Sequence, residues 1–175
     1  MKIIKTKFKD LVLIKNKVHL DKRGSFQEVI NYKILKKNFI FDCISKSKKG
    51  VLRGLHFQTK KPQGKLVTVI SGRIYDVAVD LRYKSKTYGQ YFSTVLSAND
   101  GKSIYIPPKF AHGFYCLSER CEIYYKCTNF REKKFEKTLK WNDKDLNIIW
   151  PGKKRILSKK DKKGYSFKDI NFKKN

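Results

Sequence analysis

The 175-residue sequence predicts one all-β domain, built as a jelly-roll barrel or sandwich with a few short helices. Short alternating segments rich in β-branched and aromatic residues recur along the chain, and Gly, Pro, Asn and Asp separate them. Such segments recur at fairly even spacing, which is typical of sandwiches and barrels. Because the chain has no internal repeat and no linker, we expect residues 1–175 to form a single domain.

Strands are expected at six places in the middle of the chain. These segments are residues 65–70, 73–82, 91–96, 103–106, 113–117 and 122–127. The turns between them are Tyr88-Gly89, Asn99-Asp100-Gly101 and Pro107-Pro108. Because side chains alternate across a strand, Tyr124 and Tyr125 are expected to point to opposite faces. The chain after Lys153 is the best place for one or two short helices.

The charge is strongly positive, because 42 basic residues stand against 15 acidic ones, for a net charge of +27. Three interpretations are open: a surface that binds nucleic acid through phosphates, a surface that steers a small anionic substrate, or a general preference for surface lysine. Arginine, the usual base-reading residue, is scarce, and no helix-turn-helix or zinc-finger pattern is present. We therefore expect no specific nucleic-acid partner.

Other features of the sequence narrow the class of protein. No apolar run reaches about 18 residues, so no segment is expected to span a membrane. Residues 1–5 are not followed by the apolar stretch of a signal peptide, so we expect a cytoplasmic protein. The cysteines show no CxxC pair and no zinc-like spacing, so we expect four buried or half-buried thiols, Cys43, Cys116, Cys121 and Cys127.

The chain has three histidines, and two of them lie in informative surroundings. His19 lies among polar residues before an expected turn, and we assign it no functional role. His56 follows Arg53 by three residues on an expected strand with apolar neighbours. A guanidinium that binds phosphate and an imidazole that acts as a base could therefore line one cavity. His112 follows a proline-rich turn.

The spacing of Gly101, Pro107 and His112 resembles the second half of the cupin double motif, in which a β-barrel carries its functional residues inside. A metal-binding cupin has a His-x-His pair in its first motif, whereas Phe57 and Gln58 follow the histidine here. Two imidazoles fall short of the three or four ligands of a usual transition-metal site. We therefore expect a barrel that works without a metal.

The chain resembles the dTDP-4-dehydrorhamnose 3,5-epimerase family over nearly its whole length. The matching segments are residues 21–28, 50–58, 63–67, 76–82, 106–117, 125–129, 141–143, 149–151 and 157–161. The resemblance implies a homodimeric cupin without a cofactor. It also implies an isomerase that epimerises a nucleoside-diphosphate 4-keto-6-deoxy sugar, in deoxysugar biosynthesis for surface polysaccharide.

The resemblance also implies the roles of four catalytic residues. His56 matches the base that removes a proton next to the 4-keto group, which acidifies the protons on C3 and C5. Asp161 matches the carboxylate that holds this base. Lys65 matches the cation near the sugar O4, where the negative charge of the enolate develops. Tyr125 matches the acid that returns a proton from the other side.

Residues that bind the nucleotide end are implied as well. Arg53 matches a contact with the diphosphate and the sugar. Arg23, Phe26 and Glu28 match contacts with the nucleotide, which in the family reach across the dimer into the partner's site. The nucleotide sugar and a second copy of the chain are therefore the expected partners.

Further substrate-binding positions are implied around the sugar. His112 and Asp76 match an inner polar pair with a supporting role, and Gln58 and Glu136 match substrate contacts. Arg131 stands where members that invert both centres usually carry a second tyrosine. A guanidinium does not copy the shape or the hydrogen bonding of a phenol, so this position bears on substrate specificity.

Two more departures from the family pattern lie just before the His56 motif. Phe41 and Cys43 stand where the family often has Gln and Asn, and neither can make the amide contacts. These changes leave alternatives to a 3,5-epimerase open. The alternatives are a C3-only epimerase of a GDP-linked 4-keto-6-deoxy-heptose, a 3,4-ketoisomerase and a non-catalytic sugar-binding cupin.

Overall fold

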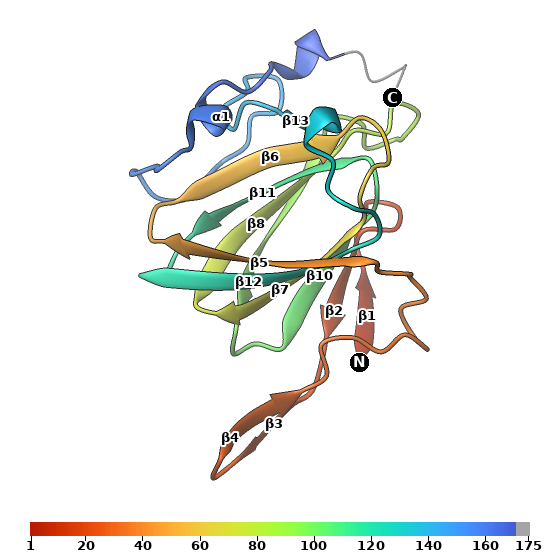
Figure 1. Cartoon of the computed structure of the whole chain (residues 1–175), viewed down its shortest axis with the longest axis vertical. Helices are drawn as coiled ribbons and strands as arrows, with labels where there is room; N and C mark the ends of the chain where they lie inside the picture. The colour runs from red at the N-terminus through yellow and green to blue at the C-terminus, as the bar shows by residue number, and fades with distance from the viewer. Residues whose placement is uncertain (171–175) are drawn as a thin grey trace.

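The computed structural model describes residues 1–170 and consists of two antiparallel β-sheets that face each other (Figure 1). The six-stranded sheet has the order β1 (Lys2–Lys5), β2 (Val12–Lys15), β10 (Lys102–Ile106), β7 (Lys65–Ser71), β12 (Arg120–Cys127) and β5 (Phe41–Lys48). The five-stranded sheet has the order β13 (Glu136–Thr138), β6 (Leu52–Gln58), β11 (Phe110–Cys116), β8 (Arg73–Asp80) and β9 (Tyr91–Ser97). Most neighbouring strands are distant in sequence, as in a jelly roll, so the predicted all-β fold class is confirmed.

Among residues 1–170, one hairpin and three short helices lie outside the two sheets. The hairpin, β3 (Val18–Asp21) with β4 (Gly24–Gln27), projects away from the sandwich at the foot of Figure 1. The helices are η1 (Lys133–Phe135), α1 (Lys159–Lys162) and η2 (Phe167–Asp169). The last two confirm the helices expected after Lys153. The domain that we predicted extends to residue 175, and its residues 171–175 lie outside the described part.

The strands predicted in the middle of the chain are present, with ends that shift by a few residues. Strand β8 ends at Asp80 rather than at Arg82, because the Asp80 carboxylate turns the chain. Its oxygens accept hydrogen bonds from the backbone and side chain of Arg82 and from the hydroxyls of Ser85 and Thr87. Strand β11 begins at Phe110 rather than at Gly113, directly after Lys109, whose φ of 65° marks the turn.

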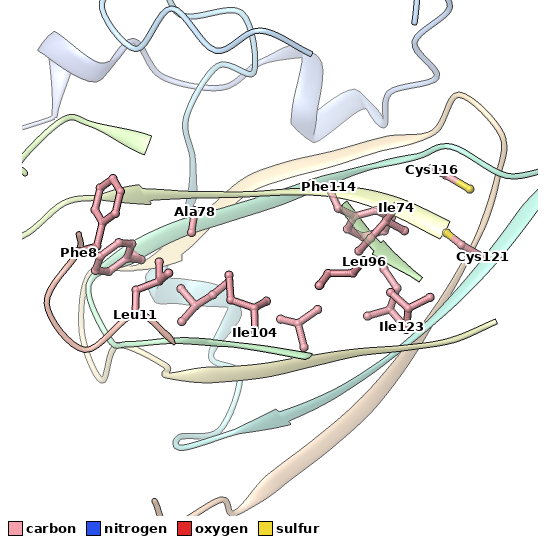
Figure 2. Packing of buried hydrophobic residues seen from close by; sticks show 14 residues of the cluster. Phe8, Leu11, Ile74, Ala78, Leu96, Ile104, Phe114, Cys116, Cys121 and Ile123 are labelled. Atoms are coloured by element: carbon pink, nitrogen blue, oxygen red, sulfur yellow. The ribbon is translucent and has the colours of Figure 1, made fainter. Parts of the chain in front are cut away.

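The main hydrophobic core lies between the two sheets (Figure 2). Ile74 and Phe114 of the five-stranded sheet face Ile104 and Ile123 of the six-stranded sheet, and all four side chains are buried. Each such side chain stabilises the fold by roughly 1.5–3 kcal/mol relative to exposure. Phe8, in the loop between β1 and β2, covers one end of this core.

A second core packs the C-terminal segment against the outer face of the five-stranded sheet. Leu52 and Leu55 of β6 and Val77 of β8 contact a cluster that includes Leu139 and Trp150. In Figure 1 this segment runs over β6, on the side away from the six-stranded sheet. The packing therefore carries residues near position 160 back to the strand that contains His56.

Gly54 allows β6 and β11 to approach closely at the same place. Its φ is +122°, and a Cβ at this position would lie 2.5 Å from the Gly113 Cα and 2.8 Å from the His112 carbonyl oxygen. Any side chain here would therefore separate the two strands. The contact fixes β6 against β11, with His56 directly opposite His112 in the register.

The thiols only partly follow the sequence-based expectation. Cys116, Cys121 and Cys127 are buried, as predicted, but Cys43 is exposed and the prediction is wrong for it. Its strand β5 is an edge strand, and the side chain points into an open cavity instead of the core. Among residues 1–170, no helix is long and apolar enough to cross a membrane.

Candidate active site

A cavity of about 440 Å³ opens between the two sheets. Strands β5, β7 and β12 line it on one side, β6 and β11 on the other, and the segment around α1 closes part of its edge. The side chains that matter for chemistry are Cys43, Ser45, Arg53, His56, Lys65, His112, Tyr125, Cys127, Arg131, Glu136, Lys160 and Asp161. Two larger surface hollows, of about 690 and 760 Å³, have lysine-rich linings without a histidine.

His56 and Asp161 form a short hydrogen bond at this cavity. The His56 Nε2 lies 2.6 Å from the Asp161 Oδ1, although 105 residues separate them in sequence. The His56 side chain is 28% exposed and the Asp161 side chain 4%. Burial alone would raise the pKa of Asp161, but the hydrogen bond and charge of His56 outweigh it and lower that pKa. An ionised carboxylate therefore holds an imidazole that remains open to the cavity.

Helix α1 positions Asp161. Ser158 is the N-cap of this helix, and its hydroxyl accepts a hydrogen bond from the Asp161 backbone N–H at 3.1 Å and donates to Oδ2 at 2.8 Å. The backbone N–H of Gly54 also donates to the Asp161 carboxylate. Just before the helix, Ile156 forms a bridge beside Val51, which joins the segment to the start of β6.

Tyr125 approaches the cavity from the opposite sheet. Its hydroxyl lies 3.4 Å from the Ser45 Oγ, and its ring meets the His112 ring edge-on with centroids 6.2 Å apart. Burial raises the pKa of Tyr125 far above its usual value, so the phenol is protonated at neutral pH. Tyr124 points to the other face of β12, where its hydroxyl donates to the Asp42 carboxylate at 2.6 Å. The predicted alternation of the two tyrosines is confirmed.

Lys65 begins β7 and its side chain lines the cavity. Burial lowers the pKa of Lys65, against the opposing effect of Cys127, Glu136 and further nearby groups. This amine is therefore not one of the solvated surface lysines that dominate the composition.

His112 and Asp76 form a second histidine–carboxylate pair, deeper in the protein. The distance from Nε2 to Oδ2 is 2.7 Å, and the side chains are 6% and 0% exposed. The two residues lie on the adjacent strands β11 and β8. Among residues 1–170, no group of three or more His, Cys, Asp and Glu side chains lies close enough together to hold a metal ion.

Cationic side chains gather at the mouth of the cavity. Arg131 and Lys160 each form an ion pair with Glu136 at 2.9 Å. Burial alone would raise the pKa of Glu136, but these two cations together lower that pKa to about 2. Arg53 donates to the Ser47 Oγ and to a backbone carbonyl, both at 3.0 Å. One carboxylate therefore faces several cations, and the mouth suits an anionic ligand.

Four residues that the family resemblance implied as substrate contacts do not line this cavity. The Gln58 side chain donates to the carbonyls of Lys61 and Phe130 and accepts from the Glu132 N–H, so it joins two loops. The other three, Arg23, Phe26 and Glu28, lie on or next to the projecting hairpin. Both the Arg23 and the Phe26 side chains are exposed.

Residues that the sequence reasoning missed complete the site. Ser158 stands three positions before Asp161, which is an ordinary N-cap signal and could have been recognised. Lys160 lies in a lysine-rich tail, and nothing in its local sequence separates it from its neighbours. Ser45 lies on a strand that was not predicted, so its contact with Tyr125 was not foreseen.

Comparison with known proteins identifies the family. The family model described as dTDP-4-dehydrorhamnose 3,5-epimerase matches residues 5–169. The chain belongs to this family. The enzyme of that name from Shigella flexneri is 43% identical, and the match covers 98% of this chain and 99% of the relative. The one from Methanothermobacter thermautotrophicus is 44% identical, with 92% and 91% covered.

Solved structures of epimerases share the fold. The crystal structure of dTDP-4-dehydrorhamnose 3,5-epimerase from Elizabethkingia anophelis has a TM-score of 0.90 and 46% identity, and covers 98% of both chains. The epimerase from Legionella pneumophila, in complex with dTDP-4-keto-L-rhamnose, has a TM-score of 0.94 and 39% identity, with 99% of this chain and 96% of that chain covered. The chain is therefore an epimerase, an isomerase of the cupin fold, as the sequence analysis predicted.

Proposed function

We propose that this epimerase inverts C3 and C5 of dTDP-4-keto-6-deoxyglucose, with His56 as the base and Tyr125 as the acid. The observation that carries the proposal is the placement of the imidazole and the phenol on opposite sheets of one cavity. An epimerase needs this arrangement, because a proton must leave one face of the carbon and return to the other.

In the first step, the imidazole of His56 removes the proton from the carbon next to the keto group. The ionised Asp161 stabilises the imidazolium that forms and keeps the ring in one orientation. Such a positioned base contributes roughly 10²–10⁴-fold to the rate. The Ser158 hydroxyl at the start of α1 holds the carboxylate, so little reorganisation accompanies the charge change.

The enolate that results carries negative charge on the sugar O4. Lys65 lines the same cavity and is desolvated, so its ammonium acts strongly on a nearby oxyanion. The proton then returns from Tyr125, whose raised pKa keeps it on the phenol until the carbanion accepts it. Ser45 and the His112–Asp76 pair hold the tyrosine in position.

The cations at the mouth would receive the diphosphate. Arg53 has a planar guanidinium that can bind two phosphate oxygens at once, and Arg131 and Lys160 add positive charge. The net charge of +27 then serves substrate capture, since a basic protein attracts an anionic nucleotide sugar over long distances.

We also propose that the chain acts as a homodimer. The β3–β4 hairpin extends beyond the sandwich and exposes 68% of Phe26 and 79% of Leu20 (Figure 1). Exposed apolar side chains on a projecting hairpin gain free energy when a second copy covers them. In this arrangement Arg23, Phe26 and Glu28 of one copy would contact the nucleotide in the partner's site.

The alternatives are not favoured, because the relatives that are 43–44% identical over nearly the whole chain carry the 3,5-epimerase name. The test is to incubate the protein with dTDP-4-keto-6-deoxyglucose in deuterium oxide and to follow C3 and C5 by NMR. We expect deuterium at both carbons. Exchange at C3 alone, or only with a GDP-linked sugar, would replace the proposal by one of the alternatives. Tyr125→Phe is expected to retain abstraction and to lose completed inversion.

A further inference from the structure

The cavity contains a pair of thiols for which the proposed reaction has no use. Cys43 on β5 lies directly opposite Tyr125 on β12, and Phe41 lies opposite Cys127. The two cysteines are therefore diagonal neighbours on the face of the sheet that lines the cavity. Their side chains are hydrogen-bonded to each other. Cys43 is exposed, whereas Cys127 is buried.

Positive charge surrounds the accessible thiol. Lys65 and Arg131 both act on Cys43 as cations, and Arg53 lines the same cavity. The hydrogen bond from Cys127 contributes most, and with these two cations it outweighs burial and the charge of Asp42, so the pKa of Cys43 falls to about 7. The thiolate form of Cys43 is therefore more favoured than that of an ordinary cysteine.

Cys127 and Cys121 differ from Cys43, because their pKa values are raised. The hydrogen bond to Cys43, together with burial, raises the pKa of Cys127. Burial and its neighbour Cys116 raise the pKa of Cys121, and the side chains of both residues lie in the core between the sheets (Figure 2). Only Cys43 among the four combines solvent access with a cationic setting.

We propose that Cys43 is a covalent modification site for small, anionic, thiol-reactive compounds, and that a group attached there closes the sugar pocket. With a halocarboxylate, the thiol proton goes to solvent and the sulfur attacks the carbon that bears the halogen. A C–S bond forms, the carbon–halogen bond breaks and the halide leaves. The cavity holds about 440 Å³ and is also lined by Tyr125 and Lys65, so a carboxymethyl group on Cys43 occupies space that the sugar needs.

The first test compares iodoacetate with iodoacetamide on the full-length protein at pH 7, with peptide mass spectrometry to locate the label. Iodoacetate carries the negative charge that the cations attract, and iodoacetamide has a similar size without it. Relative to the same ratio for glutathione, we expect the iodoacetate:iodoacetamide rate ratio at Cys43 to rise roughly tenfold. A ratio equal to that of glutathione, or equally fast labelling of Cys121, would overturn the proposal.

Two matched variants separate the role of the thiol pair. Cys127→Ala removes the hydrogen bond, and we expect Cys43 to react roughly threefold more slowly, since the loss of thiolate exceeds the gain in intrinsic nucleophilicity. Cys127→Ser keeps a donor and is expected to react like the wild type. If both variants label as fast as the wild type, the pair does not activate Cys43.

A third experiment tests whether a label on Cys43 closes the sugar pocket. Epimerase activity of the wild type is expected to fall at the rate at which Cys43 is labelled, while Cys43→Ser keeps its own initial activity under the same treatment. Full labelling with undiminished activity would contradict closure of the pocket. The labelling rates are read by mass, so they test the modification site even if the protein acts on another sugar.

Discussion

The two histidine–carboxylate pairs of this protein have nearly the same geometry and different surroundings. His56–Asp161 measures 2.6 Å and His112–Asp76 measures 2.7 Å. The first imidazole is 28% exposed at the cavity, whereas the second is 6% exposed. Access to the cavity, and not the geometry of the pair, therefore distinguishes the proposed base from the inner pair.

The pairs also differ in how the fold makes them. His112 and Asp76 lie on adjacent strands, so the sheet alone brings them together. His56 lies on β6, and its carboxylate comes from α1, which the second core docks against the outer face of the sheet. The proposed catalytic pair therefore depends on the C-terminal segment, and the inner pair does not.

The largest expected effect is a loss of turnover when Asp161 is replaced. Asp161→Asn removes the negative charge behind the imidazole and allows the ring to adopt the wrong tautomer, so kcat should fall roughly 10²–10⁴-fold. Asp76→Asn, the matched change in the inner pair, should reduce kcat much less. Steady-state kinetics on the two variants measure the difference. Equal losses would remove the functional distinction between the pairs.

For stability, in contrast to turnover, we expect the inner pair to matter more than the exposed pair. His112→Ala leaves Asp76 as a buried carboxylate without its partner, and we expect about 3–5 kcal/mol less free energy of unfolding. His56→Ala leaves Asp161 with the hydroxyl of Ser158, so the loss should be about 1.5 kcal/mol. Urea denaturation of both variants gives the two values. A larger loss for His56→Ala would mean that the exposed pair is the structural one.

A smaller effect is expected from the cap of α1. Ser158→Ala removes the hydroxyl that bonds to both the backbone and the carboxylate of Asp161, which should cost about 0.5–2 kcal/mol of stability. Because the carboxylate is less well held, kcat should also fall several-fold while KM changes little. Ser158→Thr keeps the hydroxyl and serves as the control. An unchanged kcat in Ser158→Ala would show that catalysis does not need the cap.

The smallest effect concerns pH. The pKa of Asp161 is lower in the folded protein than its usual value of 3.8, so the folded state favours the ionised carboxylate. The stability that this shift contributes is present above about pH 4 and is lost as the pH falls through the folded-state pKa. The difference in free energy of unfolding between the wild type and Asp161→Asn should therefore shrink from pH 7 to pH 3. A constant difference would contradict the assigned shift.

The amino-acid pattern predicted the sheet better than the site. Alternation placed Tyr124 and Tyr125 on opposite faces, and turn residues marked most strands from 65 to 127 correctly. Strands β1 to β5 were missed, because lysines interrupt their alternation and β3–β4 has no core to face. The contact between His56 and Asp161 spans 105 residues, and no local pattern encodes it. It was anticipated only through the family resemblance.

The structure places Gln58 and Cys43 differently from what the sequence analysis predicted. Gln58 follows the His56 motif and was assigned to the substrate, but its amide is occupied by the backbone of two loops. Cys43 was expected to be buried or half-buried like other free cysteines, yet its edge strand exposes it to the cavity. Side-chain direction at the rim of a cavity depends on tertiary packing, which composition and spacing do not reveal.

We propose that the exposed histidine of the two pairs, His56, is the base. The most direct measurement is solvent deuterium exchange at C3 and C5 of dTDP-4-keto-6-deoxyglucose, followed by NMR, with His56→Ala and His112→Ala measured beside the wild type under conditions where each is folded. We expect exchange to be lost in His56→Ala and to persist, more slowly, in His112→Ala. Exchange at the wild-type rate in His56→Ala would show that His56 is not the base.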